Sequence, residues 1–133
     1  MLTLRRLPDT FAIHRWPATS AIPAAALAAN WFSITRTANE LSLVLPSAIT
    51  LPSEHVSTDW QALAVVGPLD FALTGILAGL SGVLAQAGIS IFAISTYDTD
   101  ILLIKADRMD AAIHALQQAG YHIESAPTPT ALT

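Results

Sequence analysis

The clearest periodic pattern in the chain lies in residues 71–87, where large apolar side chains recur at spacings of three, four and seven. This spacing gathers on one helical face Leu73, Ile76, Leu77, Leu80, Val83 and Leu84. The opposite face carries small or polar side chains, namely Thr74, Ala78, Ser81, Ala85 and Gln86. Gly88 follows, as a glycine commonly does just past a helix. The pattern predicts a one-sided helix over residues 71–87.

A membrane-spanning segment is the alternative interpretation of this region. No side chain between Asp70 and Asp98 is charged, and Gly75 and Gly79 form a Gly-x-x-x-Gly pair of the kind found where membrane helices meet. After Gly88, however, the sequence changes to Ile-Ser-Ile-Phe-Ala-Ile-Ser, which is typical of a strand. The change of period and the missing basic flank favour a helix followed by a strand.

Short apolar runs separated by turn residues predict the other elements of the second half. Strands are predicted at residues 61–66, 89–96, 101–105 and 121–124, with a second helix that ends at Gly120. Asp70 is a candidate N-cap for the first helix, and Asp107 with Asp110 resembles an acidic capping box for the second. The order βαββαβ predicts a ferredoxin-like α+β sandwich, an antiparallel sheet with both helices on one face.

The first half of the chain predicts a shorter version of the same order. A strand at residues 11–16 precedes a short helix at 23–29 and a hairpin formed by 31–37 and 41–45. The run Phe-Ser-Ile-Thr at Phe32 lies 60 positions before the run Phe-Ala-Ile-Ser at Phe92, so the two hairpins are predicted to correspond. Residues 46–58 carry no second helical pattern and are predicted to return the chain or to add a strand. These features indicate a degenerate internal repeat.

Composition and charge narrow the classes of function. Apolar residues make up 53% of the 133 residues and charged residues 12%, which predicts a substantial core and argues against disorder. A formal net charge of −4 argues against nucleic-acid binding. The absence of cysteine excludes disulfides, thiolate nucleophiles and cysteine zinc sites. Arg5, Arg6 and Asp9 interrupt the first residues, so no signal peptide is predicted and a cytoplasmic protein is expected.

Three segments resemble the ACT domain family: Gly-Pro-Leu-Asp-Phe at 67–71, Gly-Ile-Leu…Leu…Leu…Ala-Gly-Ile-Ser-Ile at 75–91, and Ser-Thr-Tyr-Asp-Thr-Asp at 95–100. The chain is most similar to small bacterial two-ACT proteins, to the ACT units of aspartate kinases and to CASTOR-type arginine sensors. The resemblance implies a degenerate ACT-like half (βαββ) at residues 1–58, an ACT domain (βαββαβ) at 60–126 and a flexible tail at 127–133. It also implies a regulatory homodimer that binds a small effector, commonly an amino acid.

The same segments supply the chemistry that an amino acid needs. A tight turn at Gly67 and Pro68 would let a carboxylate approach the free N–H groups of the following helix. Hydroxyl groups, and carboxylates that could pair with an ammonium or guanidinium group, lie close in sequence. The candidate ligand-binding residues are Gly67, Pro68, Leu69, Asp70, Phe71, Thr74, Gly75, Ile76, Ser95, Thr96, Asp98, Thr99 and Asp100.

Several of these residues have a purely structural interpretation. Asp70 is equally well explained as an N-cap, and Asp98 and Asp100 flank a turn, where aspartate is common. Gly79 and Gly82 are better explained by close packing of the helix, either within the chain or across a dimer.

No pattern predicts catalysis or a metal site. The four histidines, His14, His55, His114 and His122, lack metal-ligand spacing, and no phosphate-binding loop or Gly-x-Ser-x-Gly motif is present. The prediction is a non-enzymatic regulatory protein without cofactor, metal, nucleic-acid or membrane binding. The alternative is an ACT-like dimerisation or protein-interaction module without a ligand, favoured by Ile101, where similar sequences often carry an aromatic residue. The small-residue face of helix 71–87 and a sheet edge are the expected dimer contacts.

Overall fold

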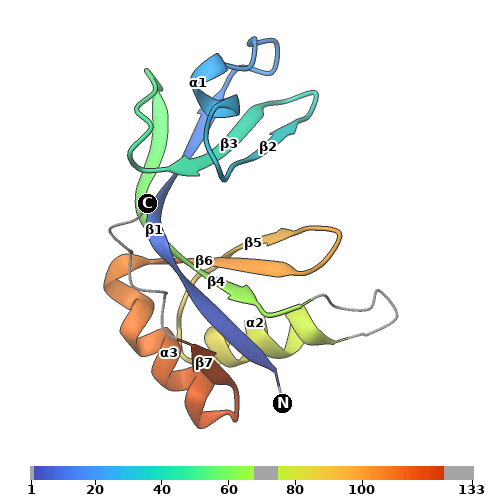
Figure 1. The fold of residues 1–133 in the computed structure, drawn as a ribbon, viewed down its shortest axis with the longest axis vertical. Coiled ribbons are helices and arrows are strands. Elements are labelled where there is room, and N and C mark those ends of the chain that lie inside the picture. Colours follow the sequence, from blue (N-terminus) through green and yellow to red (C-terminus); the bar gives the residue numbers. More distant parts are fainter. Residues whose placement is uncertain (1, 68–74, 125–133) are drawn as a thin grey trace. The chain divides into compact units, whose positions relative to one another are not determined.

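The computed structural model describes residues 2–67 and 75–124, which divide into two compact units (Figure 1). The N-terminal unit comprises Asp9–Trp60, and the C-terminal unit combines Met1–Pro8 with Gln61–Thr133. Strands β1 (Thr3–Trp16) and β4 (His55–Val65) each contribute residues to both units. Residues 1–8, which the sequence analysis assigned to the first half, therefore group with the C-terminal unit.

The C-terminal unit has the predicted order of strands and helices. After β4 come α2 (Ile76–Gln86), β5 (Phe92–Ser95), β6 (Asp100–Lys105), a 3-10 helix η1 (Ala106–Arg108), α3 (Met109–Gln118) and β7 (His122–Glu124). The strand order is β7-β1-β4-β6-β5. The ferredoxin-like α+β fold is thus confirmed. One pairing differs from the antiparallel expectation, because β7 pairs in parallel with the start of β1, with Leu4 opposite Ile123.

Both helices of this unit share one core. Leu63 and Val65 of β4, together with Leu102 and Ile104 of β6, alternate along their strands and so point to the same face of the sheet. The side chains packed with them come from both helices, namely Leu80 and Leu84 of α2 and Met109, Ala112 and Leu116 of α3. Leu4 is fully buried in the same cluster, which explains why the first residues of β1 belong to this unit. The prediction that both helices cover one face is confirmed.

The ends of the helices follow the glycine signals. The N–H of Gly88 donates to the Ala85 carbonyl at 3.0 Å and that of Ile89 to the Leu84 carbonyl at 2.9 Å, which together form a Schellman motif. Gly120, with a φ of 99°, ends α3 in the same way. The capping box predicted at the start of α3 was wrong. The 3-10 helix η1 precedes α3, and Arg108 at the N-cap makes no side-chain capping bond.

The prediction that close packing explains both Gly79 and Gly82 can be checked from the space around each glycine of α2. A β-carbon added to Gly79 would lie 2.9 Å from the Tyr121 hydroxyl, so close packing explains this glycine. A β-carbon on Gly82 would meet no described atom within 4 Å, so packing against the described residues does not explain this glycine. The helix begins at Ile76, and the predicted N-cap Asp70 lies outside the described residues.

The N-terminal unit has the strand order β2-β3-β1-β4. Helix α1 (Ala24–Leu27) follows β1, and β2 (Ser33–Arg36) forms a hairpin with β3 (Leu41–Pro46). Residues 46–58 contribute a strand, as one of the two alternatives predicted, because β4 begins at His55. The core of the unit consists of Ala26, Leu41, Leu43 and Leu45, with Trp16, Ile34, Ile49 and Leu51 packed against it.

The two hairpins correspond at a spacing of 59 positions. The β2–β3 hairpin closes at the pair Arg36 and Leu41, and the β5–β6 hairpin closes at Ser95 and Asp100. At this spacing the core residues Leu43 and Leu45 match Leu102 and Ile104. The predicted spacing of 60 was wrong by one residue. It was based on similar residues in the regions of β2 and β5, whereas the turns that close the two hairpins set the register.

None of the helices within 2–67 and 75–124 is long and apolar enough to cross a membrane, and α2, the longest of them, has 11 residues.

Candidate functional site

The turn between β5 and β6 lies against the end of β4. The Thr99 hydroxyl donates a hydrogen bond to the Val65 carbonyl at 2.6 Å, and Val65 is the last residue of β4. Gly67, two residues further on, is exposed. The structure therefore brings the predicted site residues of the turn to the same end of the sheet as Gly67.

Most polar groups of this turn are already paired with one another. The Ser95 hydroxyl donates to Asp100 Oδ1 at 2.6 Å, and the Thr96 hydroxyl donates to the Thr99 carbonyl at 3.1 Å. The Thr96 oxygen also accepts from the Thr99 N–H at 3.2 Å. The Asp98 carboxylate is exposed and makes no hydrogen bond or ion pair with any residue that the structure describes. Asp98 is therefore the carboxylate of this turn that is available to a ligand.

The other predicted residues are distributed around the start of α2. Gly75 precedes the helix with a φ of 79°, and Ile76 packs against the core of the C-terminal unit. Ile101 is only 7% exposed and lies within β6, so its side chain belongs to the interior rather than to the turn. Five predicted residues lie outside the described part of the chain, namely Pro68, Leu69, Asp70, Phe71 and Thr74.

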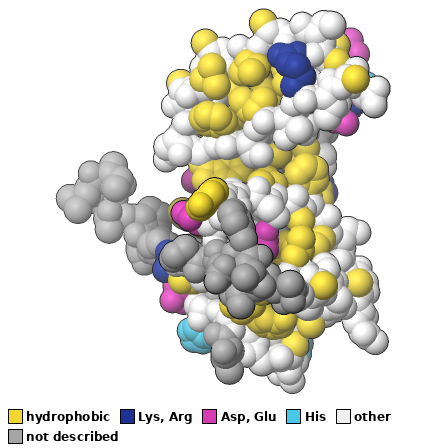
Figure 2. All heavy atoms as spheres, turned by 90° about the vertical axis from the view of Figure 1, so that its right-hand side faces the viewer, with side chains coloured by type: hydrophobic (Ala, Val, Ile, Leu, Met, Phe, Trp, Pro, Cys, Tyr) yellow, Lys and Arg dark blue, Asp and Glu magenta, His cyan; other side chains and the backbone are white. Residues whose placement is uncertain are grey.

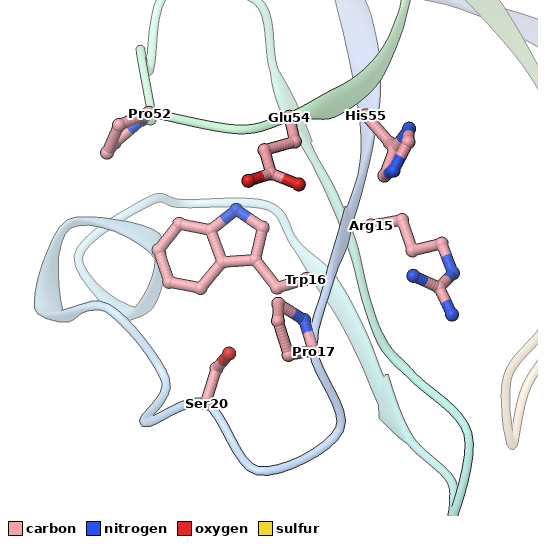
Figure 3. A pocket seen from close by; sticks show the side chains of 7 residues that line it. All are labelled: Arg15, Trp16, Pro17, Ser20, Pro52, Glu54 and His55. Carbon is pink, nitrogen blue, oxygen red and sulfur yellow. The ribbon is translucent and has the colours of Figure 1, made fainter.

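A pocket that the sequence analysis did not identify lies within the N-terminal unit. It has a volume of about 280 Å³ and is lined by Arg15, Trp16, Pro17, Ser20, Pro52, Glu54 and His55 (Figure 3). These residues come from two short segments, 15–20 and 52–55, that adjoin only because β1 and β4 are neighbours in the sheet. No motif in either segment signals a site, and only the pairing of the strands could have revealed it.

Ser53 joins the two segments of this pocket. The indole N–H of Trp16 donates to Ser53 Oγ at 2.7 Å, and Nδ1 of His14 lies 2.7 Å from the same oxygen. His14 is 4% exposed, and its Nε2 has no partner among the residues that the structure describes. Burial lowers the pKa of His14 below the ordinary histidine value, so the imidazole is held in its neutral form.

This burial predicts a pH-dependent stability. Because the pKa of His14 is lower in the folded chain, the unfolded chain takes up a proton that the folded chain does not as the pH falls through about 6.5. The free energy of unfolding is therefore expected to decrease between pH 7.5 and pH 5.5. Urea denaturation at the two pH values measures the decrease, which His14→Gln should reduce. His114→Gln, at an exposed position of α3, should retain it. Equal pH dependence in the wild type and His14→Gln would contradict the prediction.

Family models match both halves of the chain. An ACT domain model matches residues 55–118, and a second model, for an N-terminal domain, matches residues 9–49. No curated protein matches the chain significantly.

Solved structures of similar proteins cover nearly the whole chain. The crystal structure of protein Atu0741 from Agobacterium tumefaciens is 33% identical, with a TM-score of 0.87 over 96% of this chain and 95% of that one. VC0802 from Vibrio cholerae, described as a possible transport protein, is 18% identical with a TM-score of 0.68 and 85% coverage of both chains. The ligand-free regulatory subunit of aspartate kinase from Thermus thermophilus is 18% identical, with a TM-score of 0.60 over 84% of this chain and 93% of that one. The latter two show a shared fold. Residues 55–118 therefore match the ACT domain family, and the whole chain belongs to the same family as Atu0741.

Proposed function

We propose that this protein is a non-catalytic regulatory module whose ACT domain binds a small effector, an amino acid. The observation that carries the proposal is the ACT domain match over residues 55–118, which spans β4, α2, β5, β6 and α3. These elements include the strand end and the turn that form the candidate site. The fold shared with the regulatory subunit of an aspartate kinase supports a regulatory role.

The proposed effector site is the set of residues 67–71, 74–76, 95, 96 and 98–100. Asp98 is exposed and unpaired within the described structure, so its carboxylate can bind the ammonium group of the effector. Thr99 acts as a positioning residue, because its hydroxyl holds the turn against β4 through the Val65 carbonyl. Gly67 is exposed, and its backbone can supply a polar group for the carboxylate of the effector.

A thermal-shift measurement with the twenty amino acids at millimolar concentration tests this proposal. An effector present at about a hundred times its dissociation constant adds about 2.7 kcal/mol to the free energy of unfolding. For a chain of this size the midpoint should rise by several degrees. Because one effector is expected, a shift confined to one amino acid or a close group supports the proposal, whereas a flat response to all twenty contradicts it.

Asp98→Asn should weaken binding of that amino acid by about tenfold or more, since it removes one charge-assisted hydrogen bond. Asp107→Asn provides the matched control, because Asp107 is exposed in η1. Isothermal titration calorimetry measures both dissociation constants. An unchanged dissociation constant in Asp98→Asn would place the effector elsewhere.

The proposal includes a cytoplasmic homodimer built from two ACT-like units in each chain. The N-terminal unit supports the presence of two ACT-like units in each chain. Its strand order β2-β3-β1-β4 corresponds to an ACT-like unit in which the second helix is absent. The exposed small-residue face of α2 supports the dimer, and its members are Ala78, Gly82 and Ala85. Similarity to CASTOR-type arginine sensors remains a prediction from sequence.

A dimerisation or protein-interaction module without a ligand is the second candidate function. Its support is the number of large apolar side chains at the surface, and Figure 2 shows several apolar groups on the face it draws. The exposed large apolar residues are Ile22, Leu27, Phe32, Val56 and Tyr97. A flat thermal-shift response together with a concentration-dependent dimer in light scattering would favour this function over effector binding.

A further inference from the structure

We infer that the pocket of the N-terminal unit is a second binding site, for a small zwitterion that carries both an ammonium and a carboxylate group. The pocket lies entirely within Asp9–Trp60 and contains none of the residues of the proposed effector site. The inference therefore goes beyond the proposed function and does not depend on it.

The charges of the pocket match a zwitterion. Arg15 and Glu54 both line it, yet they form no ion pair with each other. The Glu54 carboxylate has no hydrogen-bond or ion-pair partner within residues 2–67 and 75–124. Arg15 donates one hydrogen bond to the Asn39 carbonyl at 3.0 Å, which leaves further N–H groups of its guanidinium free to donate. One positive and one negative side chain, not neutralised by each other, suit a ligand that is neutral overall and has separated charges.

Trp16 provides the wall of the pocket. Figure 3 shows the Glu54 carboxylate pointing toward the indole ring, with Arg15 and His55 to one side, Pro52 to the other and Ser20 below the ring in this view. A carboxylate next to an aromatic ring is a favourable environment for an ammonium group, which is attracted by both. The guanidinium of Arg15 is the corresponding group for a carboxylate.

The walls are held in place without a ligand. Ser53 lies between Pro52 and Glu54 and is bonded to both His14 and Trp16, which fixes segment 52–54 against β1. On the opposite wall, the guanidinium of Arg36 donates to the carbonyls of Ala18 and Ser20, which fixes the loop after β1. A pocket that is already formed loses less entropy when it binds. Its volume of about 280 Å³ is at the lower end of small-molecule sites, which suits a ligand the size of an amino acid.

Two-dimensional nuclear magnetic resonance of the whole chain tests this inference. The indole N–H of Trp16, assigned with Trp16→Phe, reports on the pocket, and the amides of residues 96–99 report on the effector site. The twenty amino acids are titrated, and each one that binds is compared with its amide, which lacks the carboxylate, and its N-acetyl form, which lacks the ammonium. At least one amino acid is expected to shift the Trp16 signal saturably, and both derivatives should bind at least about tenfold more weakly.

Two variants test which side chain of the pocket binds the ammonium group of the ligand and which binds its carboxylate. Glu54→Gln should weaken binding of the free amino acid about tenfold or more and remove the preference over the N-acetyl form. Arg15→Gln should instead make the affinity for the free amino acid similar to the affinity for its amide. Glu124→Gln makes the same change outside the pocket, where the glutamate pairs with Arg5 at 3.0 Å, and should leave the affinity at the Trp16 signal unchanged.

Either of two results overturns the inference. One is that none of the twenty amino acids shifts the Trp16 signal, and the other is that Glu54→Gln leaves the affinity at this signal unchanged. Shifts confined to residues 96–99 would overturn this inference while supporting the proposed function. Shifts confined to Trp16 and sensitive to Glu54 would support the pocket and contradict the effector site.

Discussion

Replacing Leu102 with alanine is expected to lower the free energy of unfolding by about 2–5 kcal/mol. Leu102 is fully buried in β6, within the core that both helices of the C-terminal unit cover. Removing its side chain takes away apolar contacts and leaves a cavity that the neighbouring strands and helices fill only in part. Urea denaturation followed by circular dichroism measures the change.

Leu27→Ala is the matched control for this substitution. Leu27 lies in α1 and is 54% exposed, so the same truncation should change the free energy of unfolding by no more than about 0.5 kcal/mol. Similar losses in the two variants would mean that the core of the C-terminal unit does not include Leu102.

Ser53→Ala is expected to lower the free energy of unfolding by about 2–4 kcal/mol, although it removes a single oxygen atom. Ser53 Oγ bonds both the Trp16 indole N–H and His14 Nδ1, so the substitution leaves two polar groups without this partner. The His14 ring is buried and its Nε2 already has no partner among the described residues. A neutral imidazole without hydrogen bonds in the interior is costly.

Two further substitutions separate this effect from the general cost of losing a serine. Ser53→Thr keeps the oxygen and should recover most of the stability. Ser81→Ala removes a hydroxyl that donates to the Ala78 carbonyl of its own helix at 3.3 Å, and should change stability by about 0.5 kcal/mol or less. If Ser53→Ala were as stable as Ser81→Ala, the hydrogen bonds to His14 and Trp16 would contribute little.

Local patterns were sufficient to predict the elements of the C-terminal unit. The helical spacing near Leu80 and Leu84 and the glycine at 88 are properties of adjacent residues, and the structure confirms both. The parallel pairing of Leu4 with Ile123 was not predictable in this way. The two residues are nearly the whole chain apart, and each strand alone is compatible with several neighbours in a sheet.

The candidate sites were even less predictable from local sequence patterns than the pairing of the strands. The turn that contains Asp98 was predicted, because its residues are consecutive and their composition is typical of a turn. The hydrogen bond from Thr99 to the Val65 carbonyl was not, since it joins a turn to the end of another strand. The pocket around Trp16 and Glu54 was missed entirely, because its two segments meet only once β1 and β4 are paired.

The use of one strand by two units has a consequence for how the protein folds. Residues 3–5 of β1 are made long before their partners in β7, residues 122–124. The C-terminal unit therefore cannot complete its sheet until residues 122–124 have been made, and its closing step joins residues that are far apart in sequence. Such contacts form slowly, because the intervening chain must first be ordered. The N-terminal unit, Asp9–Trp60, is continuous in sequence and can form during synthesis, whereas the C-terminal unit must wait until β7 has been made.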